Sequence, residues 1–332
     1  MSGSGKSTSL SLFLSQLLSL SGSSPSKPLS RMAIQVEAMQ TILTSFGHAK
    51  TLQNPNASRM SRYLELHISS STGKLSGAKV LTFGLEKSRV TAPRIGQEER
   101  TFHAFYQFLA GATTKERDEL GLEDVSDYSL LSSSGTYRLP SVPFVDADDS
   151  VGMSELRIAM KTLGFKQKNI SSIFSLLFAI LVLGNVEFAD PDAQDVAAYV
   201  VNQSVLEHAA RLLGVPKEDL EGALTNKSVY VRKEMYTVLL NKEGSEAQKQ
   251  SLMRDLYAIL VAFVVETVNH KLAPNEEEIG AAGTNQVVIL DTPGFQSRTP
   301  ASSHMSLLGG TSMFGSNGFD EFCFNYVDEM VG

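Results

Sequence analysis

The chain begins MSGSGKSTSL (residues 1–10), a stretch that has two interpretations. Phosphate-binding loops follow the pattern G-x-x-x-x-G-K-[ST]: backbone N–H groups surround the phosphates, the Lys reaches the β and γ phosphates, and the hydroxyl binds Mg²⁺. Gly5, Lys6 and Ser7 match the end of this pattern, but its first Gly would lie one position before Met1. The stretch is therefore either a phosphate loop or a Ser/Gly-rich start, and the following residues must distinguish the two.

Directly after this stretch, apolar residues recur at the spacing of one helix face. They lie at i, i+3, i+4, i+7 and i+8, namely at Leu10, Phe13, Leu14, Leu17 and Leu18. A secretory signal peptide is the alternative for residues 9–20, but Ser and Gln fill the other face, which favours an amphipathic helix. A helix that begins at GKST is what a phosphate loop requires, because the anion binds at the helix N-terminus.

The composition predicts a globular chain without a general basic surface. Its 332 residues are 42% hydrophobic, with a formal net charge of −7, and this acidic balance argues against nucleic acid as a partner. The single cysteine, Cys323, excludes an internal disulfide, and we expect it to be a small core residue at the start of a buried helix. IFSLLFAILVL (173–183) is shorter than the ~20 residues that cross a bilayer, so we expect a buried helix and no membrane span.

The order of the apolar patterns predicts an α/β fold. YLELHIS (63–69) alternates and is followed by a Gly-containing turn and a second strand near residues 79–83, which predicts a β-hairpin. From about residue 97 to 275 the periodicity is mostly helical. QVVIL (286–290) is an apolar run that predicts a strand buried on both faces.

Two further segments carry groups suited to a phosphate and a metal ion. Asp291 ends the QVVIL strand, where a carboxylate can hold Mg²⁺, and Gly294 can bring a backbone N–H against a phosphate without a Cβ in the way. NPNASR (54–59) supplies amides, a hydroxyl and a guanidinium. Taken singly, the segment around Asp291 could be only a strand followed by a Pro-Gly turn, and NPNASR could be only a polar turn. Their order after the GKS stretch favours a nucleotide site.

With these motifs in this order, the chain resembles a myosin motor domain nearly from end to end. The motifs that carry the resemblance are SGSGKST (2–8), ILTSFGHAKTLQNPNASRMSRYLELH (42–67), GKLSGAKVLTFGLEKSRV (73–90), ERTFHAFYQFLAGA (99–112), LFAILVLGNVEF (177–188), ILDTPGF (289–295) and NGFDEFCFNYVDE (317–329).

The resemblance implies an α/β fold of the P-loop NTPase type, with a mixed central sheet and a large helical upper subdomain, truncated at both ends. Residues 1–96 would hold the phosphate loop, the first switch and transducer-type strands, and residues 97–280 the helical subdomain. Residues 281–332 would hold the second-switch strand, a flexible Ser/Gly-rich insertion (297–318) and the start of the relay helix.

The same resemblance implies ATP and Mg²⁺ as cofactors and assigns roles to particular residues. The implied ATP-binding residues are Ser2, Gly3, Ser4, Gly5, Lys6, Ser7, Thr8, Asn54, Asn56, Ala57 and Ser58. The implied Mg²⁺ ligands are Ser7, Ser58 and Asp291. The implied catalytic residues are Arg59, Gly294 and Gln296.

Two of these positions depart from the pattern of active motors. Gln296 stands where motors carry a Glu that forms an ion pair with the switch Arg, so we expect Arg59 to lose its charged partner. Ala57 stands where motors usually carry a Ser near the γ phosphate. Loss of one preorganised polar contact in a transition state costs ~10² to 10³ in rate. We therefore expect ATP binding to persist and hydrolysis to be weak or absent.

LDTPGFQ (290–296), GLEKSRVTAP (84–93) and RDLYAILVAFVVETVNHKLAP (254–274) are most similar to the motor-like head of fungal class V and VII chitin synthases. This resemblance implies an actin-associated localisation or regulatory module, with actin bound weakly or indirectly and a chitin synthase catalytic domain in a longer parent chain. The head would lie on the cytoplasmic side with the cytoskeleton, and the parent chain at the plasma membrane or secretory vesicles. An active actin-dependent ATPase motor and a scaffold without nucleotide binding remain the alternatives.

Overall fold

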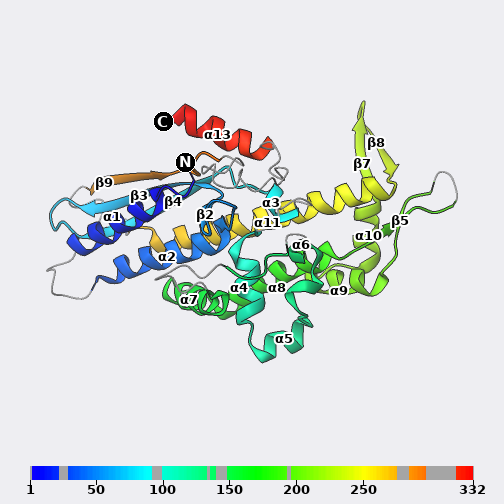
Figure 1. Cartoon of the computed structure of the whole chain (residues 1–332), viewed down its shortest axis with the longest axis horizontal. Coiled ribbons are helices and arrows are strands. Elements are labelled where there is room, and N and C mark those ends of the chain that lie inside the picture. The colour runs from blue at the N-terminus through cyan, green and yellow to red at the C-terminus, as the bar shows by residue number, and fades with distance from the viewer. Residues whose placement is uncertain are drawn as a thin grey trace, which may run out of the picture. The chain divides into compact units, whose positions relative to one another are not determined.

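The computed structural model describes residues 2–21, 29–91, 99–132, 135–139, 148–192, 196–274, 284–296 and 319–331. The chain divides into two compact units (Figure 1). The first unit comprises Met1–Glu86 and Val265–Gly332, and the second comprises Lys87–Val264. The predicted insertion at residues 297–318 lies outside the described residues.

The first unit contains a 3-stranded sheet in which β3 (Ser61–Ser69) lies between β4 (Leu75–Phe83) and β9 (Thr284–Asp291) (Figure 1). The predicted hairpin is confirmed, since β3 and β4 pair antiparallel. The predicted mixed sheet is wrong for the described strands, because β3 also pairs antiparallel with β9. The short turn between β3 and β4 accounts only for the antiparallel pairing of these two strands.

The strand β9 is not buried on both faces as predicted. Ile289 and Asp291 are buried, whereas Val288 and Leu290 are 47% and 52% exposed. Among the described strands, β9 lies at an edge of the sheet with β3 as its neighbour, and its side chains alternate between the two faces. Apolar residues on both faces of a strand therefore do not establish that both faces are covered.

Two helices of the first unit, α1 (Lys6–Leu20) and α2 (Arg31–Gly47), contact each other and the sheet, α1 at β9 and α2 at β4. The predicted first helix is confirmed, with Leu14 and Leu18 buried. Ser30 caps α2 by accepting from the Ala33 N–H at 3.2 Å.

The end of α2 leads into a small antiparallel ladder that organises the candidate site. The strands β1 (His48–Ala49) and β2 (Ala57–Ser58) pair with His48 opposite Ser58. Gly47 lies just before β1, and a Cβ added there would come within 2.3 Å of Met60 Cε. A larger residue at position 47 would therefore require the Met60 side chain to move.

The second unit is mainly helical, as predicted. Its elements before the long α11 are α3 (Ser88–Thr91), α4 (His103–Gly111), α5 (Thr114–Leu120), η1 (Val125–Asp127), α6 (Ser129–Ser132), α7 (Asp149–Thr162), α8 (Gln167–Gly184), β5 (Phe188–Ala189), β6 (Tyr199–Val200), α9 (Gln203–Leu213), α10 (Lys217–Thr225), β7 (Asn226–Val231) and β8 (Glu234–Leu239). Its core includes stacked rings, with centroids 4.7 Å apart for Phe102 and Tyr257 and 5.1 Å apart for Phe108 and Phe174.

The helix α8 contains the predicted apolar segment 173–183. By length and composition it could cross a membrane, with 18 residues and a mean hydropathy of 1.5, and 56% of it is buried inside the structure. It contacts α4, α6 and α9. These contacts agree with the predicted core helix.

The long helix α11 (Lys242–Leu272) contains the boundary between the units. In its last part, which belongs to the first unit, Asn269 binds both backbone groups of Val80 in β4, at 2.8 Å and 2.7 Å. The final helix is α13 (Phe319–Val331), which agrees with the predicted helix start. Cys323 in α13 is exposed, so its predicted core role is wrong.

Candidate functional site

The predicted phosphate loop forms a tight turn that leads directly into α1. Gly3 (φ 79°) and Gly5 (φ 86°) have left-handed backbone conformations, which favour glycine. Gly5 is the N-cap residue of α1, and no side-chain hydrogen bond caps this end of the helix. Uncapped N–H groups at a helix N-terminus are the usual partners of a bound phosphate.

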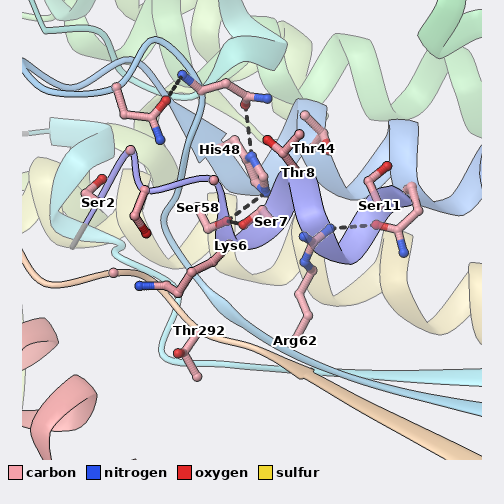
Figure 2. A pocket seen from close by; sticks show the side chains of 17 residues that line it. Ser2, Lys6, Ser7, Thr8, Ser11, Thr44, His48, Ser58, Arg62 and Thr292 are labelled. Carbon is pink, nitrogen blue, oxygen red and sulfur yellow. Dashed lines mark hydrogen bonds between the residues drawn. The ribbon is translucent and has the colours of Figure 1, made fainter. Parts of the chain in front are cut away.

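This loop forms one wall of a cavity of about 340 Å³ in the first unit (Figure 2). The cavity is lined by Ser2, Gly3, Ser4, Gly5, Lys6, Ser7, Thr8, Ser11, Gln40, Thr44, His48, Asn54, Asn56, Ser58, Arg62, Thr292 and Gly294. Every predicted ATP-binding residue except Ala57 is in this set. Ala57 is buried in β2, opposite Ala49.

Of the predicted Mg²⁺ ligands, Ser7 and Ser58 line this cavity, whereas Asp291 is buried outside its lining and contacts Ser7. The Ser7 hydroxyl donates to the Asp291 carboxylate, at 3.1 Å from Oδ1 and 3.3 Å from Oδ2. The Ser7 and Ser58 Oγ atoms are 3.3 Å apart. Hydroxyl and carboxylate oxygens are the donors that Mg²⁺ prefers, so this set fits the ion.

Asp291 also forms a buried ion pair with Arg62, which the sequence analysis did not identify. The register of β3 and β9 places Arg62 directly opposite Asp291. Arg62 Nη1 donates to Gln40 Oε1 at 2.9 Å (Figure 2). The carboxylate predicted to bind the metal is thus held between a hydroxyl on α1 and a guanidinium on β3.

Arg59 has a charged partner, so the expectation that it loses one is wrong. Its guanidinium Nε donates to the Glu86 carboxylate, and the two side chains are 1% and 6% exposed. The Glu86 N–H also donates to the Arg59 carbonyl at 2.9 Å. A guanidinium buried this deeply requires a countercharge, and the segment after β4 supplies it.

Gln296 and Gly294 occupy different places in the second-switch segment. Gly294 lines the cavity. Gln296 is buried, and Asn325 of α13 binds both of its backbone groups, accepting from the N–H at 2.7 Å and donating to the carbonyl at 2.8 Å. This segment is thereby tied to α13 through its main chain.

His48 is a further cavity residue that the sequence analysis missed. Its Nδ1 lies 2.9 Å from Asn56 Oδ1 and its Nε2 lies 3.2 Å from Ser58 Oγ. Burial, together with the nearby positive charge of Arg62, lowers the pKa of His48 to about 3. The ring is therefore neutral at physiological pH.

Comparison with known proteins identifies the class of protein. The model of the Myosin head (motor domain) family matches residues 1–331. The chain belongs to this family.

Two relatives carry chitin synthase names. Over 98% of this chain, it is 35% identical to Chitin synthase 8 of Mycosarcoma maydis. Over 99% of this chain, it is 36% identical to Chitin synthase 5 of Cryptococcus neoformans var. grubii. Myosin-1 of Arabidopsis thaliana is 32% identical over 99% of the chain. The chain spans 15%, 16% and 25% of these three proteins, respectively. The predicted family is confirmed, including its similarity to fungal chitin synthases.

Proposed function

We propose that this chain is a myosin-type head that binds ATP and Mg²⁺ in the cavity of the first unit and hydrolyses ATP slowly. The observation that carries the proposal is the meeting of Ser7, Ser58 and Asp291 beside the phosphate loop. These residues come from distant parts of the sequence, since Ser58 lies 51 positions and Asp291 284 positions after Ser7. Membership of the myosin head family supports the same cofactors.

Each wall of the cavity supplies groups for a different part of the ligand. The Lys6 ammonium and the N–H groups at the start of α1 suit the phosphates, and the Asn54 and Asn56 amides suit further polar contacts. Mg²⁺ bound by Ser7, Ser58 and Asp291 would neutralise part of the phosphate charge. Arg62 keeps the Asp291 carboxylate in place beside Ser7.

Slow hydrolysis follows from what residues 57 and 296 lack. Ala57 has no hydroxyl to orient a water molecule, and Gln296 has no charge with which to attract Arg59 across the site. Glu86 pairs with Arg59 but follows β4, so it does not connect the two switch segments. ATP binding depends on the phosphate loop and the Mg²⁺ ligands, which are present, whereas closure of the site depends on residues 57 and 296, which differ from active motors.

We expect Gln296→Glu to raise ATP turnover about 10-fold or more. A guanidinium has five N–H donors, so Arg59 can donate hydrogen bonds to a second carboxylate while it remains paired with Glu86. The measurement is the steady-state rate of phosphate release, with ATP affinity determined on the same sample. Gln296→Asn is the matched control, because it keeps an amide, and its rate should not exceed that of the wild type. Unchanged turnover in Gln296→Glu, with ATP still bound, would contradict the assigned role of residue 296.

Actin association is the second part of the proposal, and it is supported by family membership. The β7–β8 hairpin of the second unit is a suitable contact surface. Along it, Tyr230, Met235 and Tyr236 are 74%, 62% and 50% exposed. Its turn carries Arg232 and Lys233 and is followed by Glu234, so an exposed apolar ribbon ends in two positive charges and one negative charge, a net charge of +1. This combination suits an acidic protein surface.

We expect the double substitution Arg232→Glu/Lys233→Glu to weaken co-sedimentation with actin filaments by about 10-fold at low salt, because rim charges act through steering and complementarity. Lys115→Glu is the matched control, since the Lys115 side chain is 80% exposed on another element of the same unit. Equal losses in both variants would assign the effect to general charge and overturn the role of the hairpin.

We further propose that the head serves a longer chitin synthase as a localisation or regulatory module. The similarity of the whole chain to two proteins with that name supports this assignment. The head would act with the cytoskeleton on the cytoplasmic side, and the parent chain at the plasma membrane or on secretory vesicles.

A further inference from the structure

His48 joins two groups of the cavity that would otherwise be independent. It follows the last residue of α2 and is only 3% exposed, with Asn56 at one ring nitrogen and Ser58 at the other. The pairing of β1 with β2 fixes this arrangement, because His48 lies opposite Ser58 in the ladder. Figure 2 shows the His48 ring beside Ser58 and Ser7.

The hydrogen-bond partners of the ring fix its tautomer. Asn56 Oδ1 is an acceptor, so the Nδ1 atom 2.9 Å away must carry the proton and donate. In a neutral imidazole the other nitrogen then has a free lone pair. The contact of 3.2 Å between His48 Nε2 and Ser58 Oγ therefore requires that the Ser58 hydroxyl donates its proton to the ring.

The Ser7 hydroxyl proton is likewise engaged, because this hydroxyl donates to the Asp291 carboxylate. With both hydroxyl protons used elsewhere, the Ser7 and Ser58 oxygens face each other at 3.3 Å without a proton between them. The two oxygen lone pairs, beside the Asp291 carboxylate that is also paired with Arg62, are a set of ligands that suits a divalent cation. By accepting the hydrogen bond from Ser58, His48 turns the Ser58 hydroxyl proton away from the Ser7 oxygen.

We propose that His48 is a positioning residue that orients the Ser58 hydroxyl so that its oxygen faces a divalent cation, an inference that rests on the proposed Mg²⁺–nucleotide function of the cavity. His48 itself does not touch the cation. It fixes the direction of one ligand, in the way that partners behind metal ligands fix ligand orientation and raise metal affinity.

The first test compares ATP affinity in excess Mg²⁺ with ATP affinity in EDTA. We expect His48→Phe, which keeps a ring but has no acceptor, to lower the ratio of these affinities by about 10- to 100-fold. Its ATP affinity in EDTA should fall by a smaller factor, because the lost contact with Asn56 acts in both buffers, whereas the lost orientation of Ser58 acts only through the metal. His48→Gln restores an acceptor oxygen and should recover most of the ratio. A wild-type ratio in His48→Phe would overturn the inference.

The second test needs neither nucleotide nor metal. In the wild-type chain labelled with ¹⁵N-histidine, NMR at neutral pH should show His48 with a protonated Nδ1 and a bare Nε2. The signal is assigned by its loss in His48→Gln. The opposite tautomer would overturn the inference even if ATP binds. Failure of the wild-type chain to bind ATP in either buffer would instead refute the proposed function, so the two failures are distinguishable.

Discussion

Lys6→Ala is expected to abolish measurable Mg-ATP binding, with a loss of affinity of about 100-fold or more. The Lys6 ammonium is the charge that reaches the terminal phosphates in this type of loop, and no neutral side chain replaces it. In the structure it lines the cavity and lies 3.8 Å from the Asp328 carboxylate. The measurement is an equilibrium titration of the purified chain with a fluorescent ATP analogue and competition by ATP.

Asp328→Asn provides the matched control for Lys6. It removes the carboxylate that competes with phosphate for the same ammonium, so ATP affinity should be unchanged or higher. The ion pair is partly exposed, with Lys6 43% and Asp328 26% exposed, and contributes little to folding. Unchanged affinity in Lys6→Ala would contradict the phosphate-loop assignment.

Glu86→Gln is expected to lower the free energy of unfolding by about 3–5 kcal/mol. Removal of one partner of a buried ion pair leaves the other charge without compensation in a poorly solvating environment. Arg59 and Glu86 are among the least exposed charged side chains of the described residues, so water cannot replace the lost carboxylate. The measurement is urea unfolding of the chain, followed by circular dichroism and compared with the wild type.

The double variant Arg59→Met/Glu86→Leu separates charge from packing. With both charges removed, apolar side chains of similar size fill the space, and most of the lost stability should return. The double variant should nevertheless remain poor at ATP turnover, since Arg59 is gone. Equal stabilities of Glu86→Gln and the wild type would show that the Arg59–Glu86 pair does not stabilise the NPNASR segment (54–59).

The sequence was sufficient for those parts of the site that are formed by consecutive residues. The loop from Ser2 to Thr8 and the segment from Asn54 to Ser58 both carry turn and phosphate-binding chemistry in their own order. Asp291 was found because it ends an apolar strand and precedes a Pro-Gly turn. The structure brings these segments together beside one cavity, although Ala57 and Asp291 lie outside the residues that line it.

Partners that depend on pairing across the chain were not predictable. Arg62 meets Asp291 because of the register between β3 and β9, and no local pattern sets that register. Glu86 meets Arg59 for a similar reason, and the segment that contains it was recognised only as a family motif. His48 was quoted only as part of a family motif, and its contact with Ser58 depends on the pairing of β1 with β2.

The β7–β8 hairpin was missed because its turn lacks the usual signal. Two-residue turns of hairpins favour Asn-Gly or Asp-Gly, since both central residues need positive φ angles. Here Arg232 and Lys233 adopt φ angles of 50° and 73°. The same segment carries much of the exposed apolar surface of the second unit, so the unusual turn and the proposed actin contact coincide.

The most direct test of the central claim is a paired measurement of Mg-ATP affinity and phosphate release on one sample of the wild-type chain, with and without actin filaments. We expect clear ATP binding with phosphate release that stays slow in both conditions. Binding followed by rapid, actin-stimulated release would contradict it and identify an active motor. Absence of ATP binding would also contradict it and leave a scaffold with the fold of a myosin head.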